Sequence, residues 1–394
     1  MFLVLNKNFW LLWINRIFNR LAYQLVFFTL LVWVYQLTGS NSAVSLFMVM
    51  YIIASVSFSL IAGVAVDFYD RRLLIVGSNI IWGLLVLLFI PAQNNFAFIL
   101  SITLLTQALD EFFNPSQGSS LPALVEDKKL LSANSLVQIA IFAASATGYF
   151  LSGILMKYLG YPAPFVLGAA LVISGGLLAT GLPPLRHQEK TPSLREFFQR
   201  VKSHLLEQLY FLLHERNVTS TVVLLSVVSA MATGASAVLP GFAQEVWRID
   251  ARDLSFVAIL PLALGVVGAT LLLMRGWGGI KVWQAVLGLG ATTLIAAAGG
   301  QLDWWEISFL SFVLGIFVSF ATIPVLTSLQ RITPSHILGR TIGSGTLLYS
   351  FFTGIFVLTF GVVADLWGEV VPMILVGLVA LLAGFWVKAK VAIK

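Results

Sequence analysis

Residues 63–72 read GVAVDFYDRR, and they close a run from Ala43 to Val66 that contains no charged residue. Two aspartates and two arginines then fall within positions 67–72. The whole chain of 394 residues is 59% hydrophobic and 10% charged, whereas soluble domains carry roughly 25% charged residues. Many apolar runs reach the ~18–20 residues that a helix needs to cross a bilayer. The sequence therefore predicts an integral multi-pass membrane protein, with the charged stretch in a loop between two spans.

The apolar runs predict helices, because a backbone in lipid must satisfy its own hydrogen bonds and these runs are too long for barrel strands. The short connectors between the runs predict an all-α fold of twelve transmembrane helices. The predicted spans are 9–36, 42–66, 73–92, 96–117, 133–157, 162–182, 217–243, 254–274, 281–300, 305–329, 341–364 and 369–388.

The distribution of lysine and arginine predicts the orientation of the spans. If both termini lie on one side of the membrane, that side holds all of the 23 lysines and arginines except Lys157, Arg248 and Arg252. Basic residues gather on the cytoplasmic side of membrane proteins. We therefore expect cytoplasmic termini and a bacterial cytoplasmic (inner) membrane location. Because the basic residues lie at span ends, their net charge does not indicate a nucleic-acid-binding surface.

An internal repeat predicts two halves. Shifting the second half back by about 208 residues aligns Gly153 and Gly160 with Gly361 and Gly368, and two six-helix halves in parallel repeat are a known transporter arrangement. The connector between them has apolar residues at a spacing of four, which predicts either a helix lying on the membrane surface or a solvated linker helix. The predicted domains are an N-terminal six-helix bundle (1–182), a cytoplasmic amphipathic linker (183–216) and a C-terminal six-helix bundle (217–394).

The stretch 63–72 resembles the loop signature of the major facilitator superfamily, Gly-x-x-x-Asp-Arg-x-Gly-Arg-Arg. Phe68 and Asp70 depart from that pattern, and the matching positions are Gly63, Asp67, Arg71 and Arg72. The resemblance implies a gating latch in which Asp67 accepts hydrogen bonds from the start of the eleventh span, near Arg340, with Asp70, Arg71 and Arg72 in the same loop. The arginines alone would also be explained by anchoring at the cytoplasmic headgroups.

Further segments narrow the resemblance. Residues 35–40, 114–125, 131–136 and 332–340 are similar to bacterial macrolide-efflux-like and enterobactin-exporter-like permeases of this superfamily. The loop that leads into the fifth span also resembles lysophospholipid transporters. The resemblance covers essentially the whole chain and implies a transporter that works by alternating access.

Polar side chains within two predicted spans mark a candidate cavity. A central arginine costs roughly 2.5–3.5 kcal/mol in lipid, so such residues face water or partner helices. We expect one carboxylate of the fourth span to face the cavity and pair with Arg20, and the other to pack against span two or five. The carboxylate that faces the cavity either carries a proton during transport or forms a static ion pair that fixes the helix packing. The candidate residues are Asn15, Arg16, Asn19, Arg20, Tyr23 and Gln24 in span one and Gln107, Asp110 and Glu111 in span four.

These features predict a proton-coupled exporter of an amphipathic small molecule such as a drug, a siderophore or a metabolite. A lysophospholipid flippase that takes its substrate sideways from the membrane is the alternative. The chain lacks cysteine, and its four histidines lie in connectors without metal-ligand spacing. We therefore expect no metal, no cofactor besides the coupling proton, no enzymatic activity and a monomer surrounded by membrane lipids.

Overall fold

The computed structural model describes residues 6–92, 95–185, 216–275, 279–300, 302–332 and 335–392, together with single residues between 195 and 206. The side chains of 216–225, 325–347 and 389–392, and those of residues 60, 128, 131, 227, 228 and 232, are outside this description. Every regular element among the described residues is helical. Most of the predicted linker, 183–216, lies outside the described residues, so its surface helix stays a prediction.

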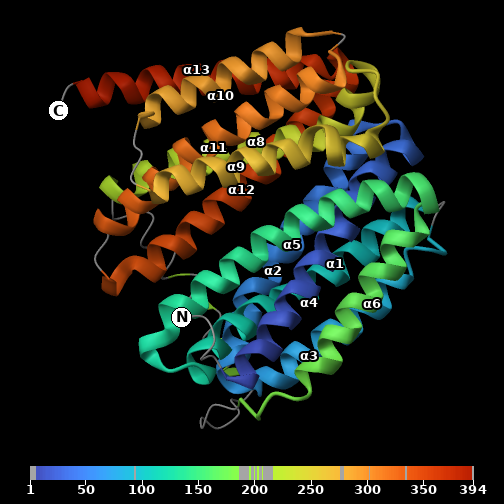
Figure 1. Cartoon of the computed structure of the whole chain (residues 1–394), viewed down its shortest axis with the longest axis vertical. Coiled ribbons are helices and arrows are strands. Elements are labelled where there is room, and N and C mark those ends of the chain that lie inside the picture. The colour runs from blue at the N-terminus through green and yellow to red at the C-terminus, as the bar shows by residue number, and fades with distance from the viewer. Residues whose placement is uncertain are drawn as a thin grey trace. The chain divides into compact units, whose positions relative to one another are not determined.

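The helices of the first part of the chain coincide with the first six predicted spans (Figure 1). A short 3₁₀-helix, Asp127–Lys129, precedes the fifth of them. The helices are α1 (Lys7–Thr38), α2 (Asn41–Phe68), α3 (Arg71–Leu87), α4 (Phe96–Leu124), α5 (Leu130–Leu159) and α6 (Pro162–Ala179).

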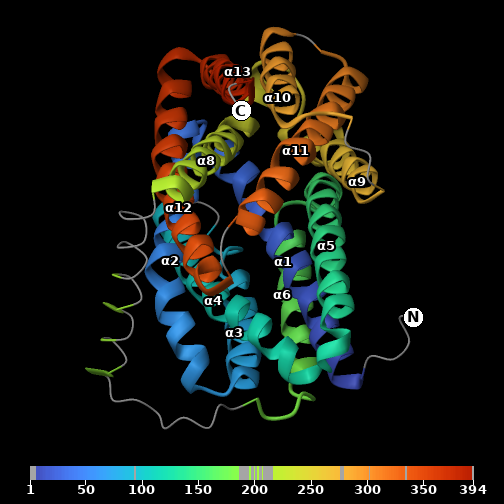
Figure 2. The same cartoon turned by 90° about the vertical axis from the view of Figure 1, so that its left-hand side faces the viewer.

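The later helices likewise coincide with the remaining predicted spans (Figure 2). A 3₁₀ turn, Ala251–Asp253, and one π-helical turn, Ser255–Ile259, lead into the second of them. The helices are α8 (Arg216–Glu245), α9 (Leu260–Met274), α10 (Val282–Ala298), α11 (Trp304–Ile332), α12 (Ser335–Trp367) and α13 (Val370–Ala392).

Nine of the described helical segments are long and apolar enough to cross a membrane. The prediction of a multi-pass, all-helical membrane protein is therefore confirmed. The count of twelve crossings and the cytoplasmic position of the termini stay predictions.

Several helix boundaries differ from the predicted ones. The third helix ends at Leu87 rather than residue 92, and α9 begins at Leu260 rather than residue 254. The fourth span was expected to end at residue 117, yet α4 continues through Pro115 and Pro122 to Leu124. Serine hydroxyls in this segment donate to helix carbonyls, as Ser119 Oγ does to the Pro115 oxygen at 2.7 Å, and transmembrane helices tolerate proline. The predicted start of the eleventh span near Arg340 is also wrong, because α12 begins at Ser335.

Local sequence explains where several helices begin and end. Asp70 and Asn95 cap α3 and α4, since each side chain accepts a backbone N–H of the first turn, as N-cap residues do. Pro162 opens α6, where its missing N–H is not needed. Gly39 follows α1 with a φ of +63°, a conformation that glycine adopts without strain.

The described chain forms two compact units by its contacts. The first contains Met1–Trp33 and Met50–Leu206, and the second contains Val34–Val49 and Glu207–Lys394. Within the first unit, α3 packs against α4 and α6 (Figure 1). Within the second, α12 lies beside α8, and α10 packs against α11 and α13 (Figure 2). The end of α1 and the start of α2 therefore belong to the second unit.

Candidate functional site

The polar side chains of α1 fall into two groups: some are buried against neighbouring helices, and the others are half-buried. Asn15, Asn19 and Gln24 are buried. Asn19 Nδ2 donates to Asn79 Oδ1 of α3 at 3.2 Å, while a Cβ added at Gly148 of α5 would lie 2.8 Å from the Gln24 Cβ. A Cβ added at Gly175 of α6 would lie 3.2 Å from Asn15 Nδ2, so all three side chains lie against partner helices. The other predicted residues of this face, Arg16, Arg20 and Tyr23, are half-buried.

Asn114 of α4 connects Arg16 of α1 with Asp110 of α4. Arg16 Nη1 donates to Asn114 Oδ1 at 2.7 Å, and Asn114 Nδ2 donates to Asp110 Oδ2 at 2.7 Å. Asp110 is only 7% exposed, whereas Asn114 is exposed. The buried carboxylate is thus joined to the arginine through a neutral amide.

Arg20 takes a different partner from the one expected. Its Nε donates to Ser145 Oγ of α5 at 2.8 Å, and its guanidinium carbon lies 5.2 Å from the centre of the Tyr23 ring. Neither Arg20 nor Asp110 forms a direct ion pair with the other in the described part of the chain. The predicted Arg20 pair is therefore wrong, because serine and a tyrosine ring occupy the guanidinium.

Glu111 lies on the side of α4 that faces α2. Gln107 Nε2 donates to Glu111 Oε1 at 3.0 Å, and Tyr23 Oη donates to Gln107 Oε1 at 3.4 Å. Ser55 of α2 also lies beside the Glu111 carboxylate. The side chain is half-buried, and its partners are neutral. Gln107 thus links Glu111 to the polar face of α1.

Aromatic rings adjoin these polar groups. Tyr51 of α2 packs edge-on against Tyr23 and Phe27 of α1, with ring centroids 6.2 Å and 5.3 Å apart. The site therefore combines charged groups with an aromatic cluster, Tyr23, Phe27 and Tyr51. Among the described residues, no three His, Asp or Glu side chains form a group that could hold a metal.

The residues that sequence reasoning missed are neutral partners of the predicted charges. Asn114 lies four residues after Asp110, a spacing that places two side chains on the same helix face, so the sequence held a signal for it. Tyr51, Ser55 and Ser145 lie on other helices, and their positions depend on how those helices are rotated.

Asp70 in the loop after α2 has a structural role. Its Oδ1 accepts the backbone N–H of Arg72 at 2.9 Å and that of Leu185 at 3.0 Å. Arg71 Nη1 donates to the Ser119 carbonyl of α4 at 2.9 Å. Asp70 and Arg71 therefore hold α3 to the chain after α6 and to the end of α4.

Other parts of the predicted latch have different surroundings. Gly63 and Asp67 are exposed, and a Cβ at Gly63 would meet no described atom within 4 Å. Arg340 lies inside α12, but its side chain is outside the described residues. The latch between Asp67 and the start of α12 therefore stays a prediction.

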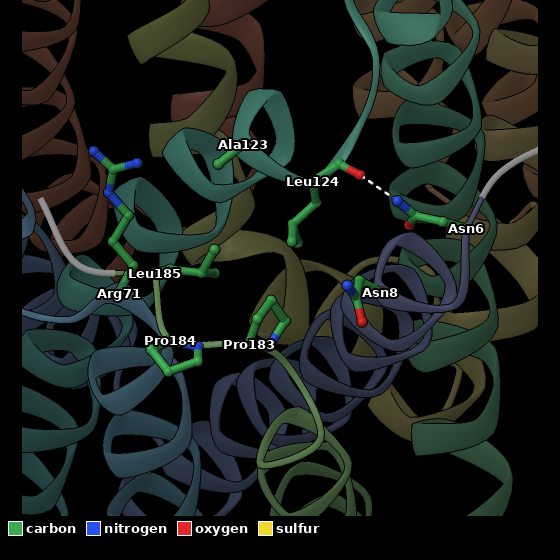
Figure 3. Close-up of a pocket in the computed structure, with 8 residues that line it drawn as sticks. All are labelled: Asn6, Asn8, Arg71, Ala123, Leu124, Pro183, Pro184 and Leu185. Carbon is green, nitrogen blue, oxygen red and sulfur yellow. Dashed lines mark hydrogen bonds between the residues drawn. The ribbon is translucent and has the colours of Figure 1, made fainter.

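A cavity of about 420 Å³ lies next to this loop. Figure 3 shows Pro183 and Pro184 on one side and Asn6, whose Nδ2 donates to the Leu124 oxygen at 2.6 Å, on the other. Arg71 directs its guanidinium away from the prolines (Figure 3), in keeping with its bond to Ser119. The cavity thus lies among the ends of α1, α4 and α6 rather than beside Glu111.

Solved structures of similar fold come from several kinds of transporter. The nucleoside transporter NupG is 13% identical with a TM-score of 0.76, covering 98% of this chain and 99% of that one. A peptide transporter POT in complex with sulfate is 14% identical with a TM-score of 0.75, covering 100% and 96%. The human organic anion transporter MFSD10 is 13% identical with a TM-score of 0.65, covering 96% and 98%. These similarities show a shared fold.

Sequence comparison identifies the family directly. The uncharacterized MFS-type transporter YjbB of Bacillus subtilis (strain 168) is 26% identical over 184 residues, which cover 44% of this chain and 44% of that relative. The match therefore spans less than half the length of that relative. The model of the Major Facilitator Superfamily matches residues 12–347, most of the chain. The chain accordingly belongs to the major facilitator superfamily and is a membrane transporter of that type.

Proposed function

We propose that this protein is a secondary active transporter that works by alternating access and exports an amphipathic small molecule in exchange for protons. The observation that carries this proposal is Glu111, a half-buried carboxylate within a transmembrane helix whose partners are the neutral Gln107 and Ser55. Ionisable groups within a membrane are costly and mark ion or substrate pathways. A bound proton is the simplest way to neutralise such a carboxylate during part of the cycle.

The neighbouring carboxylate is less suited to carrying the proton. Asp110 is buried and accepts from Asn114, which also binds Arg16. Its partner Asn114 also accepts from Arg16, so this carboxylate is part of a fixed network between α1 and α4. We therefore assign Asp110 to fixing α1 against α4, and Glu111 to coupling.

The surroundings of Glu111 support an amphipathic substrate. The aromatic cluster supplies apolar contact area, while Arg20 and Glu111 supply opposite charges at its edge. In the second unit, the hydroxyls of Thr233 in α8 and Tyr349 in α12 lie 2.8 Å apart, and such groups can contact a polar head. A drug, a siderophore or a metabolite with a charged head and an apolar body would match the charged groups and aromatic cluster of the first unit.

We also propose that the protein is a monomer in a bacterial cytoplasmic membrane. Within its superfamily, we place it in the macrolide-efflux-like and enterobactin-exporter-like branch. Thermal stabilisation of the purified protein by amphipathic dyes, siderophores and lysophospholipids would select a ligand, because a ligand that binds the folded state stabilises it. Transport of that ligand in proteoliposomes is then measured with and without a pH gradient. Acceleration by the gradient supports the proposal. Transport of lysophospholipid that ignores the gradient would instead support the flippase alternative.

A further inference from the structure

The first turn of α2 binds a carboxylate of α12 within the second unit. Asp365 Oδ1 accepts the backbone N–H of Asn41 at 2.8 Å, and Oδ2 accepts that of Ser42 at 3.0 Å. The Ser40 hydroxyl also donates to Oδ2, at 2.7 Å. The first N–H groups of a helix have no partner within the helix. One aspartate, distant in sequence, therefore caps the start of α2.

Further groups strengthen the same contact. Asn41 Nδ2 donates to Glu369 Oε1 at 2.9 Å and to Asp365 Oδ1 at 3.2 Å. Asn41 is only 1% exposed. The positive end of the helix dipole also favours carboxylates at this position. The contact therefore combines a charged cap with a buried amide.

Two glycines allow the helices to approach this closely. A Cβ at Gly361 of α12 would overlap Ser45 Oγ and lie 2.8 Å from the Asn41 carbonyl oxygen. A Cβ at Gly241 of α8 would lie 2.6 Å from Asn41 Oδ1. Ser45 is fully buried. The start of α2 thus packs directly on α12 and α8 where neither has a side chain.

We propose that Asp365, Asn41 and Gly361 form a gate that closes the extracytoplasmic end of the transport path and breaks when that end opens. The inference rests on the proposed alternating access and on the predicted orientation, which places the start of α2 and the end of α12 at that face. Asp67, at the opposite end of α2, is predicted to bind the start of α12 in the same way.

Cysteine accessibility tests the gate, because the chain has no cysteine of its own. Ser45→Cys reports on the buried contact and Gly63→Cys on the exposed opposite end of α2. Each is labelled with a maleimide dye in purified protein. Asp365→Asn weakens the charged cap, and we expect labelling at position 45 to accelerate about tenfold, as for the loss of one charge-assisted bond. Labelling at position 63 should fall, because alternating access closes one end as the other opens.

Matched variants separate gating from damage. Asp303→Asn makes the same change at an exposed site on the same predicted membrane face, and it should alter neither rate. Gly361→Ala should reproduce the effect of Asp365→Asn, whereas Gly354→Ala should not, since a Cβ at Gly354 meets no described atom within 4 Å. Unchanged labelling at position 45 would overturn the gate. Faster labelling at position 45 without slower labelling at position 63 would mean that the contact has only loosened locally. That result would overturn the gate as well.

The labelling experiment uses neither substrate nor proton gradient, so it separates the gate from the transport activity. If the rates change as expected while no pH gradient drives transport, the gate stands and proton coupling fails. If transport follows the gradient while Asp365→Asn leaves labelling unchanged, proton-coupled export stands and this gate fails.

Discussion

Asn114 Nδ2 lies 2.7 Å from Asp110 Oδ2 one turn earlier on α4, and the Asn114 oxygen accepts from Arg16 of α1. Asn114→Ala would leave the buried Asp110 carboxylate without this donor. We expect the free energy of unfolding to fall by about 1–3 kcal/mol, the cost of an unsatisfied buried polar group. Unfolding of the purified protein in detergent measures the change. Asn134→Ala, at an exposed asparagine of α5, is the control, and equal stability of the two variants would contradict this role.

Asp70 and Asp67 should behave differently although they lie three residues apart. Asp70→Ala removes the cap of α3 and the acceptor for Leu185, so we expect a loss of about 0.5–2 kcal/mol in unfolding free energy, as for other N-caps. Asp67 is exposed, and Asp67→Ala should leave stability unchanged. Thermal unfolding compares the two variants. A larger loss for Asp67→Ala would show that the roles of the two aspartates are reversed.

Gly148 sets the distance between α5 and α1. Gly148→Ala would place a Cβ 2.8 Å from the Gln24 Cβ and 2.9 Å from the Leu21 oxygen. We expect destabilisation of about 1–3 kcal/mol, as for other overpacked cores. Gly77→Ala in α3 meets no described atom within 4 Å, so better helix propensity should leave stability equal or slightly higher. Matching melting temperatures for the two variants would argue against close packing at Gly148.

The sequence predicted the helices well, because apolar length and composition largely decide which segments cross a membrane. It also placed Arg16 and Asp110 in one candidate cavity, and in the structure Asn114 joins the two side chains. The sequence could not show which partners the two arginines take. Ser145 reaches Arg20, and Asn114 reaches Arg16, only at particular helix rotations and side-chain rotamers.

From the family resemblance we predicted that Asp70 belongs to the latch, but in the structure Asp70 is the N-cap of α3. An aspartate directly before a helix is a recognised start signal, so this role was readable from the sequence. Its second bond, to Leu185, depends on the chain returning 115 residues later. Asp365 was missed for a similar reason, because its partners lie more than 320 residues away.

The proposed coupling role of Glu111 can be tested by comparing two transport modes in proteoliposomes. Glu111→Gln keeps the shape of the side chain and its bond to Gln107 possible but removes the titrating group. The ligand selected by thermal stabilisation is followed in substrate exchange without a gradient and in transport driven by a pH gradient. Glu126→Gln, at an exposed glutamate after α4, makes the same change as a control.

We predict that Glu111→Gln retains substrate exchange but no longer responds to the pH gradient, while Glu126→Gln matches the wild type in both modes. Loss of both modes in Glu111→Gln would place the residue in substrate binding instead. Gradient-driven transport by Glu111→Gln at the wild-type rate would contradict proton coupling through Glu111.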